Sequence, residues 1–589
     1  MTAPAPGGPA SKESATGSAE LTMPLHGERS ERYLVGIRMP PPTQAFVPPH
    51  RSMDDIVAYL KRQEGVEVVG RIKLGRARPF AAEVGSDEEV VVAKIPELKA
   101  QRLRAIAPAD LIIERDGSLR SADYLPVPAR NVAVAALLPL RPVAREVSIR
   151  VVGAHDKPLA RALVLIDGGG IPAQGFTDEN GQARLTYFGG PIETLQTLFV
   201  RPAIDHWDRV MHAPQLRTGI NTVRMRPLAE SRSTLPHARL STWNQRLMGL
   251  EPGGGRRTAN GVKIGLIDSG CDNSHPLLRH ITHGKDFTGG AETSWTEDSA
   301  SQGTHSAGII SAMDVEPGSI GCAPDAELYI CKVLPQGRVS DLLAALDECI
   351  AREVDVIHIG VVTDGYSELA RQKLQEARHK GIATVVAAGN SGGAVSFPAM
   401  VSEVMAVAAV GKATEFPADS SHALNVAAQL MGHEEVFMAR FSATGPQIAV
   451  CAPGVAVVST APGAGFAAVD GTCAAAAHVA GFAAVVLAQH PLFNEETAPL
   501  GRSELRVRAL FDLIRASAVA YYPDPRRAGS GVPNLARVPW ALDVASGMAM
   551  AARSELMTPS VFWPAYARVA DQHFPPPWLT TQGAAVSFY

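Results

Sequence analysis

The chain has 589 residues, of which 46% are hydrophobic and 19% charged, so it is long enough for several folded units and has a globular composition. Its formal net charge of −4 provides no excess of positive charge to neutralise phosphates, which excludes a nucleic acid as the expected partner. No acidic loop or Cys/His cluster has the spacing of metal ligands, so neither a metal nor a cofactor is expected.

The first stretch of the chain, residues 1–30, is rich in Pro, Gly, Ser and Ala and lacks the apolar core of a secretory signal. We expect it to be disordered, and we expect a cytoplasmic protein without a membrane partner. The longest apolar run, 474–488, is interrupted by His478 and Gly481 and falls short of a membrane span, so it predicts a buried helix. The six scattered cysteines are expected to be buried thiols rather than disulfides.

Residues 31–127 show the order strand, helix, strand, strand, helix, strand, which is typical of a ferredoxin-like split-βαβ domain. Ser52 precedes the first helix and Asp55 follows three residues later, a pairing that predicts a capping box at the start of that helix. The strands are expected in YLVGIRM, VEVVGRIKL, EEVVVAKIP and ADLIIERDG, and the helices in SMDDIVAYLKRQ and ELKAQRLRAI.

Residues 145–228 carry short apolar runs at close spacing, with turn signals such as Asn180-Gly181 between them. This pattern is typical of a small β-sandwich. The stretch from DKPLARALVLIDGG to NGQARL resembles the sandwich modules of the carboxypeptidase-regulatory type, a resemblance that implies no catalytic residue. Residues 229–258 are expected to be a linker.

From 259 to 548, apolar runs suited to buried parallel strands alternate with helical patterns. This alternation predicts an α/β fold with a doubly wound parallel sheet, in which ligands bind beyond the carboxyl ends of the strands. Residues 549–589 combine proline with aromatic residues, and we expect them to form a C-terminal tail that wraps around its own domain.

Four segments in this region carry candidate chemistry. VKIGLIDSG places Asp268 at the end of a buried strand, SQGTHSAG follows, VVAAGN ends on Asn390, and GTCAAAAHVAG contains Cys473. In this order they resemble the aspartate, histidine, oxyanion and nucleophile segments of subtilisin-like serine proteases, the subtilases. The resemblance implies that Asp268 is the carboxylate of the triad and that Asn390 is an oxyanion donor. A structural role for Asn390, satisfying backbone groups at a strand end, is an equal alternative.

Two positions depart from the subtilase pattern. Gln302 stands where the family has its general base, and Cys473 stands where it has the nucleophilic serine. Glutamine has no titratable group near neutral pH, and loss of the base alone costs on the order of 10⁶ in kcat. The remaining histidines of these segments are expected to be structural or to point away from Cys473: His275, His305, His358 and His478.

The unit at 31–127 also resembles the subtilisin propeptide, which in active relatives assists folding and then inhibits from the cleft. SADYLP, with Tyr124, is where its tail would enter the cleft. Because a sandwich follows before the subtilisin-like domain, release by self-cleavage is not assured. Residues 360–362, Gly-Val-Val, stand where the family has its substrate-binding strand.

Our leading hypothesis is therefore a subtilase homologue without proteolytic competence that binds a peptide or a partner protein, with an intact subtilase as one candidate partner by family analogy. The first alternative is a peptidase or acyl-transfer enzyme that uses Cys473, since the start of a helix lowers a thiol pKa. The second alternative is a serine endopeptidase that substitution has disabled.

Overall fold

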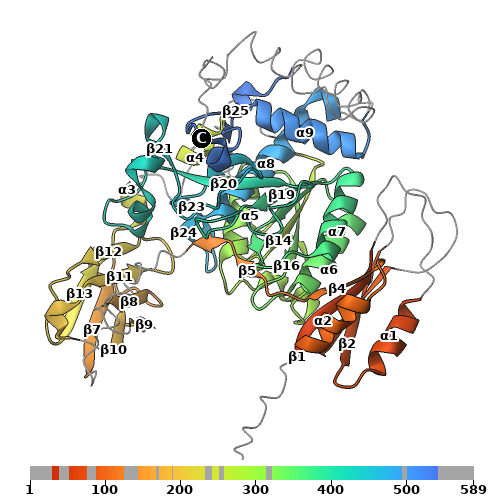
Figure 1. Cartoon of the computed structure of the whole chain (residues 1–589). Helices are drawn as coiled ribbons and strands as arrows, with labels where there is room; N and C mark the ends of the chain where they lie inside the picture. The colour runs from red at the N-terminus through yellow and green to blue at the C-terminus, as the bar shows by residue number, and fades with distance from the viewer. Residues whose placement is uncertain are drawn as a thin grey trace, which may run out of the picture.

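The computed structural model describes residues 30–38, 52–75, 88–124, 143–167, 172–188, 190–231, 242–250, 258–313, 321–493 and 500–540. The expected disordered stretch up to residue 29 and the expected C-terminal tail lie outside these residues. Figure 1 shows a large unit in the centre, with an N-terminal unit and a β-sandwich on opposite sides of it.

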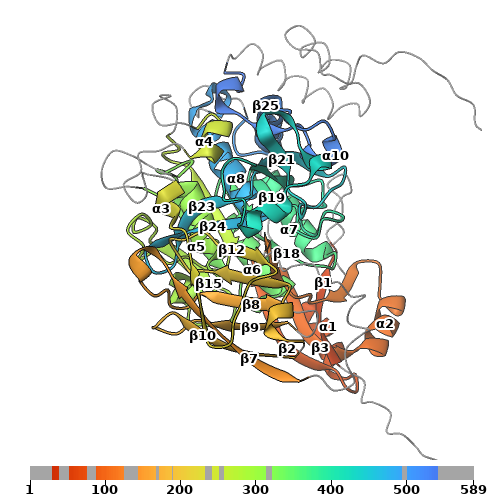
Figure 2. The same ribbon diagram turned by 90° about the vertical axis from the view of Figure 1, so that its left-hand side faces the viewer.

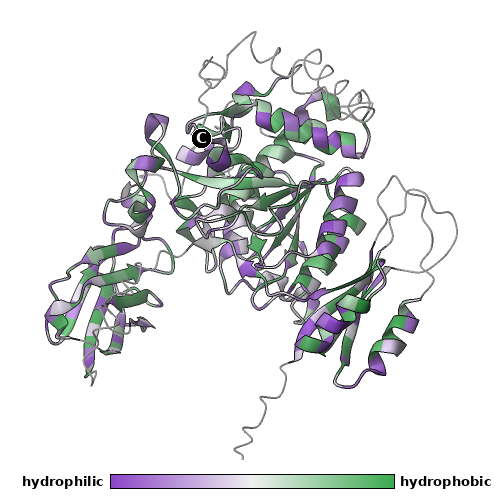
Figure 3. Ribbon diagram, in the orientation of Figure 1, coloured by the Kyte–Doolittle hydropathy of each residue, from purple (hydrophilic) through white to green (hydrophobic). Residues whose placement is uncertain are grey.

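The large unit is built on a sheet with the strand order β15-β16-β14-β17-β19-β20-β21, and with β22 beside β20. The pairs from β15 to β20 are parallel, whereas β21 is antiparallel to β20, so the doubly wound α/β fold expected from the sequence is confirmed. The central strands are mostly hydrophobic (Figure 3). The strands are β14 (Lys263–Asp268), β15 (His283–Asp286), β16 (Glu327–Lys332), β17 (Val356–Ile359), β19 (Ala383–Ala387), β20 (Met405–Lys412), β21 (Val436–Met438) and β22 (Ile448–Pro453).

Helices cover both faces of this sheet. On β14, the glycine at 265 faces Cys349 of α6, whereas Asp268 faces Ser306 of α5, so α6 and α5 lie on opposite faces. Helix α8 packs beside α5. It is long and apolar enough to cross a membrane, whereas the sequence analysis expected the run to be too short for that. However, 89% of its 18-residue apolar window is buried inside the fold, which is typical of the core helix of a globular domain. The helices are α4 (Trp243–Leu247), α5 (Gln302–Ser311), α6 (Val339–Ala351), α7 (Glu368–His379), α8 (Thr472–Gln489), α9 (Glu504–Ala516) and α10 (Pro525–Ala528).

Short strands complete the large unit. They are β18 (Val361–Val362), β23 (Val457–Ala461), β24 (Gly465–Gly471), β25 (Ala518–Val519) and β26 (Val532–Pro533). Two of them, β18 and β24, pair with strands that come from the N-terminal part of the chain, and they therefore matter for the candidate site.

The N-terminal unit is an antiparallel sheet with the order β2-β3-β1-β4 and two helices. Ser52 and Asp55 form the expected capping box of α1, with N–O distances of 3.2 and 3.1 Å. Alternate residues of the sheet divide between two cores: Tyr33 packs with the helices of its own unit, and Leu34 packs with the core of the large unit. The elements are β1 (Ser30–Ile37), α1 (Met53–Lys61), β2 (Glu67–Leu74), β3 (Glu88–Pro96), α2 (Glu97–Ile106) and β4 (Leu111–Arg115).

Two carboxylates of the N-terminal unit dock it on the large unit by binding the starts of α6 and α7. Asp116 accepts hydrogen bonds from the backbone N and the Oγ of Ser340, at 2.9 and 3.0 Å. Glu114 accepts from the backbone N of Glu368 at 2.8 Å, and burial raises its pKa. The first N–H groups of a helix have no partner within the helix, so a carboxylate placed there is stabilised by hydrogen bonds and by the helix dipole.

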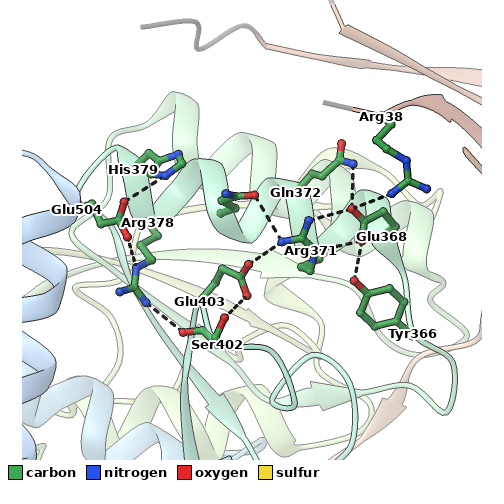
Figure 4. Close-up of polar contacts among 11 residues, drawn as sticks. Arg38, Tyr366, Glu368, Arg371, Gln372, Arg378, His379, Ser402, Glu403 and Glu504 are labelled. Atoms are coloured by element: carbon green, nitrogen blue, oxygen red, sulfur yellow. Dashed lines mark hydrogen bonds and ion pairs between the residues drawn. The ribbon is translucent and has the colours of Figure 1, made fainter. Parts of the chain in front are cut away.

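Side chains along α7 add a charged network to this contact (Figure 4). Arg38 of the N-terminal unit lies 3.6 Å from Glu368, which also binds Arg371 at 2.9 Å. The hydrogen bond from Arg371 lowers the pKa of Glu368 to about 2. Arg371 continues to Glu403 at 2.7 Å, so the network links the N-terminal unit to the body of the large unit.

The β-sandwich consists of the sheets β10-β7-β13 and β12-β11-β8-β9, and it faces the viewer in Figure 2. The sequence predicts strands in VSIRVVG, ARALVLIDG, QARLTYFGG and TLFVRPA, which contain residues of β7, β8, β10 and β11, whereas β9, β12 and β13 were not expected. A loop of the sandwich carries Trp207 into the core of the large unit, where its side chain is 1% exposed. The elements are β7 (Ala144–Val152), β8 (Leu163–Asp167), β9 (Ala173–Phe176), β10 (Gln182–Phe188), β11 (Thr197–Arg201), β12 (Arg209–His212), β13 (Ile220–Arg224) and α3 (Leu228–Ser231).

We expect Asp116→Ala to lower the free energy of unfolding by about 2 kcal/mol, because it leaves buried donors at the start of α6 without their acceptor. Urea unfolding followed by circular dichroism measures the loss, and hydrogen exchange at Ser340 locates it. The control is Glu67→Ala, which removes an exposed ion pair with Lys94 inside the N-terminal unit and should cost less than about 0.5 kcal/mol. Equal losses in the two variants would contradict the docking role.

Candidate functional site

The candidate residues meet at the carboxyl edge of the large sheet, where ligands of such sheets bind. Asp268 is the last residue of β14, Gln302 is the first of α5, Asn390 follows β19, and Cys473 is the second residue of α8. Residues far apart in the sequence are therefore brought together by strand ends and helix starts. Among the described residues, no group of three or more His, Cys, Asp or Glu side chains is arranged to hold a metal ion.

Asp268 is completely buried and accepts hydrogen bonds from neutral donors. Its Oδ1 accepts from the backbone N of Ser269 at 2.8 Å. Its Oδ2 accepts from Ser306 Oγ at 3.2 Å and from Gln302 Nε2 at 3.3 Å. The two donors on Oδ2 stand on successive turns of α5, so this helix positions the carboxylate.

The Gln302 side chain is hydrogen-bonded at both ends of its amide. Its Nε2 also donates to the carbonyl oxygen of Gly360 at 2.5 Å, and its Oε1 accepts a hydrogen bond from Ser121 Oγ. Gln302 is 1% exposed. The position at which the sequence resemblance expects a base thus holds a buried amide, which neither takes nor releases a proton near neutral pH.

Gly360 makes room for this amide. A Cβ atom at residue 360 would lie 2.2 Å from Asp268 Oδ2 and 2.8 Å from Gln302 Nε2. Both distances are too short for non-bonded atoms, so a side chain at this position would displace Gln302 or the carboxylate. The sequence marks residue 360 only as a departure from the family's substrate strand, and the structure supplies its physical reason.

Asn390 is oriented by the start of α8. Its Oδ1 accepts from the backbone N and the Oγ1 of Thr472, at 3.0 and 2.8 Å. These two bonds direct Nδ2 outward, and Nδ2 donates to the carbonyl oxygen of Ala122. The arrangement combines the two roles that the sequence left open, because the same side chain satisfies a helix-terminal N–H and presents a donor to a peptide carbonyl.

The carbonyl at Asn390 belongs to the chain itself, because residues 119–124 run through the site as an extended strand. The backbone N of Leu119 donates to Gly337 O at 2.8 Å. Strand β5 (Arg120–Ser121) then pairs antiparallel with β18, and the backbone N of Ala122 donates to Gly360 O at 3.1 Å.

Beyond Ala122 the same strand changes partner. Strand β6 (Asp123–Tyr124) pairs antiparallel with β24, opposite Gly471 and Asp470. The sequence places the entry of the propeptide-like tail in SADYLP, with Tyr124, and within this segment the carbonyl of Ala122 lies at Asn390. The bond that follows this carbonyl is Ala122–Asp123.

Cys473 lies at the start of α8, directly after the threonine that orients Asn390. Its side chain is 1% exposed. It is one of six cysteines that are all buried thiols, as expected from the sequence.

His358, which the sequence does not direct at Cys473, lies beside Asp268 in the structure. It is completely buried on β17, and its Nε2 lies 3.7 Å from Asp268 Oδ2. Neither ring nitrogen has a hydrogen bond to the described residues. Pairing of His358 with Leu266 places it on the face of the sheet that also carries Asp268, a relation that needs the strand register and not the sequence alone.

His305 and His478, the histidines of the two helix-start segments, form hydrogen bonds with backbone carbonyls. His305 Nε2 lies 2.9 Å from Val457 O, and His478 Nδ1 lies 2.8 Å from Ala474 O. Burial lowers the pKa of both imidazoles to about 4. Both rings are therefore neutral near pH 7 and support the packing of α5 and α8.

Comparison with known proteins gives independent information on the family of this chain. A sequence model of the subtilase family matches residues 259–531. Subtilisin of Bacillus pumilus is 35% identical over 245 residues, which cover 40% of this chain and 80% of that protein. Subtilisin E of Bacillus subtilis (strain 168) is 35% identical over 245 residues, and the alkaline protease of Alkalihalobacillus alcalophilus is 34% identical over 241 residues. Each of these two alignments covers 40% of this chain, but only 58% and 57% of the respective relative, less than two thirds of its length.

We expect Gly360→Ala to lower the free energy of unfolding by about 1–3 kcal/mol, because the added methyl group overlaps Asp268 and Gln302. Thermal unfolding monitors the change, and the side-chain amide resonances of Gln302 report its displacement. Gly365→Ala is the matched control, since a Cβ there meets nothing within 4 Å. An unchanged Gln302 signal in the first variant would contradict the close packing.

Stability should fall on acidification because His305 and His478 titrate at about 4 when folded. Between this value and the ordinary histidine pKa of about 6.5, the unfolded chain binds protons that the folded chain does not, so each residue contributes a loss of up to about 1.4 kcal/mol per pH unit. Urea unfolding at pH 5, 6 and 7 measures this slope, and His305→Gln should reduce it. A slope that is identical with and without His305 would refute the assignment.

Proposed function

The chain belongs to the subtilase family, and from this membership we propose that it is a proteolytically inactive homologue that acts by binding a peptide or a partner protein. The observation that carries the proposal is the Gln302 amide, which is hydrogen-bonded to Asp268, to Gly360 and to the chain's own Ser121. A group held in this way binds, but it does not move protons.

The size of the catalytic contribution that a general base makes supports proteolytic inactivity. Attack on a peptide carbonyl needs a base to activate the nucleophile and an acid to protonate the leaving nitrogen. In subtilisin, loss of the histidine alone lowers kcat roughly 10⁶-fold, nearly as much as loss of the whole triad. The donor on Asn390 is worth only about 10²–10³. The oxyanion-type donor therefore does not compensate for the amide at Gln302.

The arrangement around Gln302 bears on the two alternative readings. If isolated substitutions had disabled a serine protease, the residues around position 302 would not be expected to fit a glutamine. Gly360, however, leaves the space that the Gln302 side chain fills. A cysteine peptidase needs a base for its thiol, and the residue aligned with the base is an amide. Both features favour a site adapted to binding over one adapted to hydrolysis.

The binding proposal rests on the strand edges of the cleft. Strands β18 and β24 already hold an extended segment, so a peptide that displaces residues 119–124 would pair with the same edges. A second mode uses the N-terminal unit, whose Glu114 and Asp116 bind helix starts of a subtilase-type domain. An intact subtilase would present similar helix starts, which makes it a candidate partner.

The test is to restore both residues. We expect the double variant Gln302→His, Cys473→Ser to cut its own chain at Ala122–Asp123, because Ala122 O already lies at Asn390. Intact mass and N-terminal sequencing identify the cut. Adding Asn390→Ala to this variant should slow the cut about 10²–10³-fold.

The unmodified chain should stay full length and leave peptide substrates uncut over the same period. A labelled peptide of residues 117–124 should bind more tightly to a variant whose own segment is weakened by Leu119→Asp than to the unmodified chain. Robust peptidase activity of the unmodified chain would overturn the proposal, and absence of peptide binding to the Leu119→Asp variant would remove the cleft as the binding surface.

A further inference from the structure

A buried ionic cluster joins the β-sandwich to the strand that leads into the candidate site. His422 belongs to the segment between β20 and β21, and its Nδ1 lies 2.6 Å from Asp470 Oδ1 on β24. Its other ring nitrogen, Nε2, lies 3.9 Å from Asp208 Oδ1 of the sandwich. One imidazole thus stands between two carboxylates from different units.

The remaining hydrogen-bond partners hold the two carboxylates in place. Asp470 also accepts from Asn425 Nδ2 and from the backbone N of Ala456, each at 2.7 Å. Asp208 accepts from the backbone N of Ser421 at 3.0 Å. These hydrogen bonds come from neutral donors, so His422 is the titratable group that contacts both carboxylates.

The surroundings of His422 favour its protonated form. Burial lowers the pKa of a histidine, yet attraction by Asp470 and Asp208 outweighs it, and the pKa of His422 is raised. Arg201 is the cation whose repulsion opposes this. The rings of Trp207 and Phe416 pack around the imidazole at centroid distances of 5.7 and 5.9 Å and exclude water.

The cluster lies where it can influence the cleft. Asp470 pairs through its backbone with Tyr124 of the segment that fills the site, and it stands three residues before Cys473. The sandwich is also the next unit along the chain after this segment, and the unit docked through Asp116 is the one before it.

We propose that His422 is a pH-sensitive latch that, when protonated, holds the sandwich against β24 and thereby keeps residues 119–124 in the cleft. The latch regulates the binding surface of the proposed function and rests on it in that respect. Because docking favours the proton, docking is strongest below the ordinary histidine pKa of about 6.5 and weakens as the pH rises through the raised pKa of His422.

Hydrogen exchange of the full chain between pH 5.5 and 9 tests the latch, with each rate corrected for the intrinsic effect of pH. The reporters are interface amides, Asp205 N bonded to Phe466 O at 2.7 Å and Val210 N bonded to Asp419 O at 2.7 Å. Their protection should fall as the pH rises, by at most about tenfold per pH unit. Amides inside the sandwich, such as Val151, serve as the reference and should keep their protection.

Two variants isolate the imidazole. His422→Asn keeps a donor for Asp470 without a charge, and Asp208→Asn removes only the carboxylate of the sandwich; both should flatten the pH profile. Asp419→Asn is the control. It breaks ion pairs with Arg209 and Arg226, which stay charged throughout, so it should lower protection equally at every pH.

Opening of the interface should also expose the cleft, so the amide of Ala122 should lose protection in parallel with Val210. A pH-independent interface, or an unchanged profile in both His422→Asn and Asp208→Asn, would overturn the latch. Loss of protection at Val210 with full protection at Ala122 would also overturn it, because the sandwich would then not control the cleft. Peptidase activity of the unmodified chain would refute the proposed function and leave these exchange results unaffected.

Discussion

The hydrogen bonds of the Gln302 amide are the constraint on which the rest of the site depends. They connect the end of β14, the residue after β17 and the segment that crosses the cleft, through Asp268, Gly360 and Ser121. An imidazole at this position would exchange a proton with the nucleophile. The amide instead links three segments of the chain, and one of them is the strand that crosses the site.

The units that precede and follow this strand along the chain are both docked on the large unit. Upstream, Asp116 binds the start of α6, and downstream the sandwich carries Trp207 into the core of the large unit. Tethering to two docked units keeps residues 119–124 at a high effective concentration beside the strands that they pair with. Release of the segment therefore depends on the docking of both units as well as on the affinity of the segment for its own strand partners.

Two buried aspartates, Asp268 and Asp470, each lie beside a buried histidine. Asp268 is completely buried with neutral donors around it, and Nε2 of His358 lies 3.7 Å from its Oδ2. Asp470 is likewise buried, but His422 contacts it directly at 2.6 Å. Removing His422 is costly, because its pKa is raised and its carboxylate partners would be left in a medium of low dielectric constant. Both pairs therefore couple segments that are distant in the sequence.

Local patterns in the sequence determined the α/β fold, the capping box at Ser52 and the segments that carry Asp268, Gln302, Asn390 and Cys473, because apolar period, cap chemistry and short motifs all act over a few residues. The short edge strands β9, β12 and β13 were not predicted, because their sequences lack a strong alternation of apolar and polar residues. Only the tertiary structure decided that Ala122 lies at Asn390, that His358 faces Asp268 and that His422 bridges two units. Each of these contacts joins residues across strand register or domain docking, which burial and packing of whole units select and which no local stretch of sequence encodes.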